Sequence, residues 1–272
     1  KQRGWKTESM IDLFYYVLVP VLLATIILMW VPYSWFRYIA LLTELILLGM
    51  AAHLFWYVKQ NGTVVQHIGG WQPYIGITLR VDLMTSSFLL LTVLLFLCMI
   101  LFNYEHEYVD KRFLFLLITW QGLISGIFLS NDLFNIFILI EVCTIIVSML
   151  ILYKKEKRSV YDSLVYLLLN LVAASFLLMG IGYIYRTLGV FDFYGIAEKI
   201  RELGQPQPLI LPYAFIMTGV CLKSALMPLF GWLPKAHGTP GAPSIVSAIL
   251  SGLYVKSGLY LFIRMQEAFG GI

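Results

Sequence analysis

The chain has 272 residues, of which 60% are hydrophobic and 12% are charged, and its formal net charge is +4. Soluble domains are about 45–50% apolar and about 25% charged, so this composition predicts an integral membrane protein. The small, dispersed positive charge argues against nucleic acid as a partner, because no basic run is interleaved with aromatic residues.

Eight apolar stretches are long enough to cross a bilayer, which takes about 20 residues of helix. We therefore expect an all-α integral membrane protein with about eight transmembrane helices and mostly short connections. The stretches lie at about 11–31, 36–58, 82–103, 112–130, 132–153, 160–186, 208–228 and 242–265.

Two longer connections interrupt this series. Residues 59–81 contain Gly-Gly, Pro and alternating Ile/Thr/Leu, which predicts a short β-hairpin between the second and third helices. Asp82 follows directly and is expected to cap the third helix or to hold the hairpin. Residues 187–207 contain Gly, Asp and charges of both signs, and they predict a polar loop before the seventh helix.

The orientation prediction rests on lysine and arginine, which are enriched in cytoplasmic loops. The total numbers of cations on the two sides, eight and nine, do not decide it. The densest cluster, KKEKR at 154–158, occupies one short loop, and short loops dominate this bias. We expect 154–158 in the cytoplasm and the N-terminus outside, in a multi-pass protein of the cell inner or plasma membrane.

Ionisable side chains inside the predicted helices indicate function. A charge at the centre of a membrane helix costs about 2.5–3.5 kcal/mol, so such residues face protein or water. Four residues meet this description: Glu44, Glu141, Lys223 and Lys256.

Glu141 lies near the middle of the fifth helix, with Thr144 and Ser148 on the same face. Lys223 is its expected partner. Burial disfavours the charged form of a lysine and a nearby carboxylate favours it, so such a site can gain and lose a proton as the carboxylate moves. Pro228 removes a backbone donor and predicts an interruption of the helix near Lys223. The pair is expected either to move protons or ions, or to lock two helices together.

Three further residues allow two interpretations each. Lys256 lies in the middle of the eighth helix among serines and glycines, which suits close packing and water, and snorkelling to the interface is the alternative. His237, in "WLPKAHG" near the membrane edge, is either a proton relay or a structural hydrogen-bonding residue. Glu44 is either functional or part of a peripheral contact with another subunit.

The sixth helix carries a stripe of residues at four-residue steps. This stripe either lines a hydrated path or packs and hydrogen-bonds against a neighbouring helix, and we favour packing. It consists of Asp162, Tyr166, Asn170 and Ala174.

No motif for a cofactor or metal is present in the sequence. The three cysteines, Cys98, Cys143 and Cys221, are separate residues in apolar runs, which predicts packing roles. A Gly-rich phosphate loop, an HExxH motif, a cysteine cluster and a histidine pair suited to haem are all missing. We expect no cofactor and no metal site.

Several motifs together resemble a known family. The run "LKSALMPLFGWLPKAHGTPGAPSIVSAILSGLYVKSGLYLFIR", "DLFNIFILIEV" and "GGWQPYIGITLRVD" are similar to the antiporter-like subunits of respiratory complex I, membrane-bound hydrogenases and Mrp-type cation/proton antiporters. The details "PKAHGTPGAPS" and "GGW…GI" are most similar to the D-type subunits of the Mrp branch. The resemblance covers nearly the whole chain.

The resemblance implies a role for each candidate residue. Glu141 would modulate the charge of Lys223, which lies on an interrupted seventh helix. Lys256 would take the proton sideways along the membrane, with His237 close to the route. The topology of the family also places the loop 154–158 in the cytoplasm.

The resemblance further implies the organisation of the chain. Residues 1–110 would form three N-terminal transmembrane helices with the hairpin, and 111–272 the first five-helix antiporter repeat, helices four to eight. Members of the family carry a second, inverted repeat that holds the exit half-channel. That repeat is absent from this chain, so we expect the exit on another part of the protein or on a partner.

The leading expectation is a proton-translocating membrane subunit of a multisubunit Na⁺/H⁺ antiporter, a transporter subunit rather than an enzyme. Its partners would be other membrane subunits, protons, Na⁺ and the lipid bilayer. One alternative is the non-redox, proton-pumping part of a complex I-type NADH–quinone oxidoreductase or a membrane-bound hydrogenase. A second is a structural or assembly subunit in which the Glu–Lys pair is a static clamp.

Overall fold

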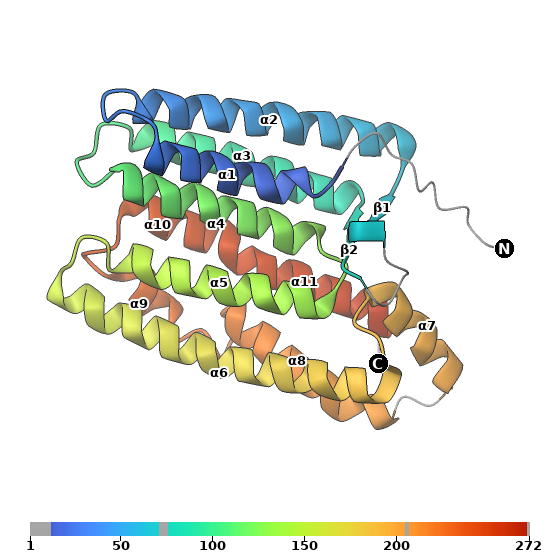
Figure 1. Cartoon of the computed structure of the whole chain (residues 1–272). Helices are drawn as coiled ribbons and strands as arrows, with labels where there is room; N and C mark the ends of the chain where they lie inside the picture. Colours follow the sequence, from blue (N-terminus) through green and yellow to red (C-terminus); the bar gives the residue numbers. More distant parts are fainter. Residues whose placement is uncertain (1–11, 71–75, 205–206, 271–272) are drawn as a thin grey trace. The chain divides into compact units, whose positions relative to one another are not determined.

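A computed structural model describes residues 12–70, 76–204 and 207–270 (Figure 1). The chain packs as two compact units, Lys1–Ser130 and Asn131–Ile272. The family-based division at 110/111 concerns helical repeats and stays a prediction.

The N-terminal unit is built from four helices and a hairpin. Helix α1 packs against α4 and α2, and α2 packs against α3. The hairpin strands pair antiparallel, with Val64 opposite Val81, which confirms the predicted hairpin, although its part at 71–75 lies outside the described residues. The elements are α1 Tyr15–Met29, α2 Phe36–Asn61, β1 Val64–His67, η1 Ile68–Gly70, β2 Thr78–Val81, α3 Leu83–Phe102 and α4 Lys111–Leu129.

Asp82 performs both of its expected roles between β2 and α3. Its side chain accepts a hydrogen bond from the backbone N–H of Thr85 at 2.9 Å, which caps the first turn of α3. It also forms an ion pair with Arg80 of β2, with 3.0 Å between nitrogen and oxygen. The hairpin and the third helix are therefore joined through one carboxylate.

The C-terminal unit contains the remaining helices. Helix α6 packs along α8 and against α5, and α11 packs against α8 and α7. The elements are α5 Leu133–Ile151, α6 Lys157–Leu188, α7 Phe193–Leu203, α8 Gln207–Lys223, α9 Leu233–Gly238, α10 Ser244–Ile249, the π-helical turn η2 Leu250–Tyr254, and α11 Val255–Phe269.

Within the described residues, six helical segments are long and apolar enough to cross a membrane. They are α2, α3, α4, α5, α6 and the continuous segment Ser244–Phe269. The other two predicted spans correspond to the shorter apolar helices α1 and α8. The predicted all-α membrane fold is confirmed.

Two predicted boundaries were wrong. The predicted interruption of the seventh helix near Lys223 is confirmed, but the span was expected to continue to about 228. Helix α8 ends at Lys223, because the backbone turns into the left-handed region at Ala225 (φ 50°) ahead of Pro228. The predicted loop 187–207 contains the helix α7. Asp192 caps α7 by accepting a hydrogen bond from the Gly195 N–H at 2.8 Å. The apolar residues Phe193 and Ile196 of this helix are buried. The prediction considered only the polar composition of the segment and therefore missed the helix.

The N-termini of α5 and α7 lie side by side. Asp132 and Asp192 form an isolated antiparallel bridge, and Asn131 donates a side-chain hydrogen bond to Asp192. Burial, with a smaller effect of the Asp192 carboxylate, raises the pKa of Asp132 above its ordinary value. This contact holds the start of α5, the helix that carries Glu141 and Thr144.

Candidate functional site

Helix α5 carries the carboxylate of the candidate site. The Asp132 side chain caps this helix by accepting from the backbone N–H of Asn135 at 2.7 Å. Glu141 and Thr144 are one turn apart and lie on one face of the helix. Thr144 is fully buried, whereas the Glu141 side chain is 22% exposed. Glu141 is thus held at the edge of the packed interior.

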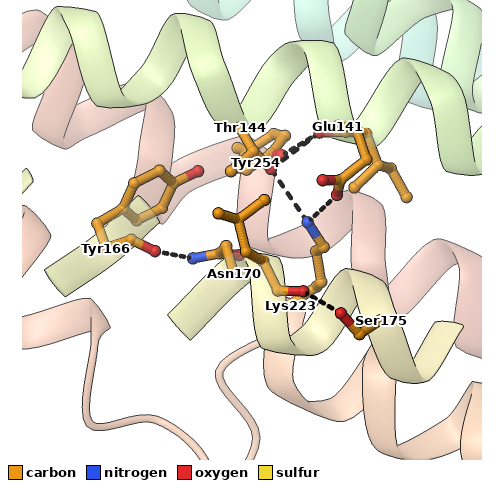
Figure 2. Close-up of polar contacts among 9 residues, drawn as sticks. Glu141, Thr144, Tyr166, Asn170, Ser175, Lys223 and Tyr254 are labelled. Atoms are coloured by element: carbon orange, nitrogen blue, oxygen red, sulfur yellow. Dashed lines mark hydrogen bonds and ion pairs between the residues drawn. The ribbon is translucent and has the colours of Figure 1, made fainter. Parts of the chain in front are cut away.

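Lys223, the last residue of α8, meets this face of α5 (Figure 2). Its side chain is 6% exposed. The ammonium group donates to Glu141 Oε1 at 2.7 Å and to Thr144 Oγ1 at 3.0 Å. The structure therefore brings together the two residues that the sequence paired, and adds a hydroxyl to the coordination of the amine.

The end of α8 is stabilised by a residue from beyond the break. The last carbonyl groups of a helix lack partners within it and need others when buried. Trp232 supplies one, because its indole N–H donates to the carbonyl oxygen of Leu222 at 2.7 Å. Trp232 is 1% exposed and packs edge-on against the ring of Tyr166, with 5.3 Å between ring centroids. This contact joins the interrupted helix to α6.

Buried polar groups of α6 and of the last helical segment surround the pair. The Tyr166 hydroxyl lies next to Tyr254 and Thr144 without a hydrogen bond of standard geometry. The Tyr254 hydroxyl donates to the carbonyl of Ile140 at 3.4 Å. Figure 2 shows Tyr166, Asn170 and Tyr254 around Lys223. The predicted stripe of α6, residues 162, 166, 170 and 174, is buried throughout, in keeping with packing.

Tyr254 was missed in the sequence. It occupies the end of the π-helical turn, two residues before Lys256, and its side chain is 4% exposed. An aromatic residue inside an apolar helix carries no positional signal. The only cue available was the phenolic hydroxyl, which usually needs a partner when buried.

Lys256 and His237 lie outside this cluster of side chains. Lys256 is exposed on α11 and donates to the carbonyl of Ser251 in its own helical segment. His237 is exposed on α9 and is tied to α10, with Nδ1 3.1 Å from the Ser247 carbonyl and the Ser247 hydroxyl 3.0 Å from the His237 carbonyl. Among the described residues, no hydrogen bond or ion pair joins Lys256 or His237 to Glu141 or Lys223. The relay roles of Lys256 and His237 therefore stay predictions.

The arrangement suits proton exchange on a nitrogen. An ammonium group with a carboxylate and a hydroxyl as acceptors is stabilised in its charged form, and moving the carboxylate away reverses this preference. In the described part of the chain, no group of three or more His, Cys, Asp or Glu side chains could hold a metal ion.

Comparison with known proteins identifies similar sequences. A family model described as NADH:quinone oxidoreductase/Mrp antiporter, transmembrane region, matches residues 130–270. The D-type Na⁺/H⁺ antiporter subunit of Alkalihalophilus pseudofirmus is 30% identical over 213 residues, which cover 76% of this chain and 42% of the relative. The D-type antiporter subunit of Bacillus subtilis is 28% identical over 211 residues, with the same coverage of 76% and 42%.

Solved structures show the same fold. The Mrp complex of a Dietzia species contains a chain with a TM-score of 0.86 and 25% identity, covering 95% of this chain and 49% of that one. A chain of the archaeal membrane-bound sulfane sulfur reductase gives a TM-score of 0.87 at 25% identity, with coverage of 96% and 54%. For respiratory complex I of Thermus thermophilus the TM-score is 0.79 at 20% identity, covering 96% and 54%, which shows the fold alone.

The similarity is to part of each relative. The chain spans 42% of the length of the two antiporter subunits. The residues that match the family model, 130–270, include both Glu141 and Lys223.

Proposed function

Because the chain belongs to the NADH:quinone oxidoreductase/Mrp antiporter family of membrane subunits, we propose that it is a proton-translocating subunit of a multisubunit Na⁺/H⁺ antiporter. The observation that carries this proposal is the ion pair between Lys223 and Glu141 at an interruption of an apolar helix. A buried ion pair is weak evidence for stability, and ionisable residues within a membrane commonly mark a transport path.

In the proposed mechanism the proton is bound on the Lys223 amine. With Glu141 at 2.7 Å, the charged ammonium form is favoured. When Glu141 moves away, the buried charge loses its counter-ion, and the amine passes its proton onward. Thr144 accepts from the same ammonium group and keeps the amine oriented during this exchange.

Lys256 and His237 are the proposed continuation of the path. Lys256 lies in the middle of the segment Ser244–Phe269, which is long and apolar enough to span the membrane, and its side chain is exposed. An exposed ammonium group in hydrocarbon is costly, so we infer that other protein or water covers it in the assembled complex. Further membrane subunits and the rest of a longer protein are both suitable sources of this cover.

The test is Na⁺/H⁺ antiport by the assembled complex in proteoliposomes. In Lys223→Ala and in Glu141→Ala, we expect antiport to fall to the level of empty liposomes. Lys199→Ala is the matched control, because Lys199 forms an ion pair of 2.8 Å with Glu202 on the exposed surface of α7. Its removal should leave antiport unchanged. Full antiport in both variants of the buried pair would contradict the relay.

A static clamp is separated from a relay by a neutral replacement of both residues. Breaking a buried pair on one side costs about 3–5 kcal/mol, so single variants can also lose activity through unfolding. The double variant Glu141→Gln, Lys223→Met removes both charges and retains similar shapes. A clamp predicts preserved antiport, whereas the relay predicts a folded complex with none.

A second candidate function is a proton-pumping part of a redox complex. It is favoured by the TM-score of 0.87 to a chain of the sulfane sulfur reductase, an archaeal respiratory membrane complex. Neighbouring genes distinguish the two: cation antiporter subunits support the first proposal, and iron–sulfur or quinone-site subunits support the second.

A further inference from the structure

A second buried carboxylate lies in the N-terminal unit, whereas the proposed relay belongs to the C-terminal unit. Glu44, in the middle of α2, has 0% exposure. Gln121 of α4 is also fully buried, and its Nε2 donates to Glu44 Oε2 at 3.0 Å. Within the described residues, Glu44 has no cationic partner, unlike Glu141.

The other oxygen of each of these two side chains bears on the protonation state of Glu44. Glu44 Oε1 and Gln121 Oε1 are both buried and without a hydrogen-bond partner. An ionised carboxylate has only acceptors, as has an amide oxygen, so neither atom can satisfy the other. A buried carboxylate with neither a cation nor a full set of donors is also unstable on electrostatic grounds.

One proton resolves both deficits. Placed on Glu44 Oε1, it gives the carboxyl group a donor, and Gln121 Oε1 is an acceptor that lacks one. The carboxyl group and the amide then exchange two hydrogen bonds, N–H to Oε2 and O–H to the amide oxygen. We propose that Glu44 is protonated and forms a reciprocal acid–amide pair with Gln121, which makes it a buried proton-binding site between α2 and α4.

The surroundings of the pair are neutral. The ionisable side chains of α1 and α3, the helices packed against α2, are Tyr15, Tyr16 and Cys98. The cations of α4, Lys111 and Arg112, stand nine or ten residues before Gln121, about 14–15 Å along the helix. On α2 itself, Arg37 stands seven residues before Glu44, about 10 Å along the helix, and its guanidinium donates to the carbonyls of His106 and Val109. No charged group on these four helices therefore forms an ion pair with Glu44.

A small cavity adjoins the amide side of the pair. Its volume is about 10 Å³, and its lining includes Tyr16, Gln121 and Ser125. That is room for about one water molecule. A water there would connect Gln121 to the Tyr16 hydroxyl, which donates to the Met50 carbonyl at 3.2 Å. Loss of the proton would leave a carboxylate uncompensated between α2 and α4, so protonation and the contact of these helices are coupled.

Infrared absorption tests the proposal on the full-length protein purified in its membrane complex. At neutral pH the wild type should show the C=O stretching band of a protonated carboxyl group, and the band should shift in D₂O. Glu44→Gln should abolish the band while the complex stays assembled, because two amides form the same pair of hydrogen bonds. Glu107→Gln, at an exposed loop position, is the control and should retain the band.

A second variant tests the partner. Gln121→Leu removes the amide and should move the band to higher frequency, because the carboxyl group loses its hydrogen bonds. Identical spectra for the wild type and Glu44→Gln would show an ionised Glu44 and overturn the proposal. A band that keeps its frequency in Gln121→Leu would overturn the pairing. Absence of any protonated-carboxyl band from the wild-type spectrum at neutral pH would overturn the proposal without the need for a variant.

Discussion

At the scale of single residues, Trp232 shows how one side chain maintains an interrupted helix. A helix that ends inside a membrane leaves carbonyl groups without partners, and each such group is costly in hydrocarbon. The indole N–H of Trp232 satisfies the Leu222 carbonyl, one residue before Lys223. The position of Lys223 thus depends in part on a residue nine positions further along the chain.

Trp232→Phe should lower the stability of the purified protein. Phenylalanine keeps the ring contact with Tyr166 but lacks the N–H donor, so the Leu222 carbonyl keeps only the hydrogen bond from the Ala225 backbone N–H, at 3.1 Å. We expect a loss of about 0.5–1.5 kcal/mol in the free energy of unfolding, measured by thermal unfolding in lipid nanodiscs. Trp30→Phe, at a position 70% exposed, is the control. Equal melting temperatures for the two variants would contradict this role.

At the scale of elements, the close approach of α6 and α8 positions Lys223 against α5. A methyl group at Gly219 would lie 2.8 Å from the Ala173 carbonyl oxygen, and one at Gly180 would lie 2.8 Å from the Pro212 carbonyl oxygen. Small residues are how membrane helices achieve such contact. Backbone atoms of the facing helix lie this close at both positions, so a change of side-chain rotamer alone would not relieve the overlap.

Gly219→Ala should force α6 and α8 apart. Overpacking of this kind costs about 1–3 kcal/mol, and it acts one turn before Lys223, so antiport should fall together with thermal stability. Gly182→Ala, also on α6, is the matched control, because a methyl group there meets no atom within 4 Å. Alanine is favoured over glycine in a helix by about 1 kcal/mol, so Gly182→Ala should be neutral or stabilising. A Gly219→Ala variant as stable as Gly182→Ala would contradict the tight contact.

At the scale of the whole chain, the sequence predicted what the bilayer and buried charge demand. The helices could be predicted from the length of the apolar stretches. The pair Glu141–Lys223 could be predicted because a charged side chain within a membrane helix needs a partner of opposite charge. The interruption near Lys223 could be predicted from Pro228, but the last residue of α8 could not, because it also depends on the left-handed backbone at Ala225 and on the hydrogen bond from the distant Trp232. Helix α7 was missed because only a few of its residues are apolar and buried. Tyr254 was missed because its position beside the Glu141–Lys223 pair depends on the π-helical turn, which the sequence does not indicate.

The orientation of the chain in the membrane remains to be tested. The cluster KKEKR, 154–158, lies at the N-terminal end of α6, and α7 follows the C-terminal end of that helix, so a membrane-spanning α6 places them on opposite sides. Positive charge favours the cytoplasm, which predicts 154–158 inside. With the native cysteines replaced by alanine, a membrane-impermeant maleimide applied to intact cells should label Glu202→Cys and Gln60→Cys but not Glu156→Cys. All three positions are exposed, so access to the side chain does not bias the result. Labelling of Glu156→Cys alone would show the opposite orientation, and the proposed relay would then take up its proton from the opposite side of the membrane.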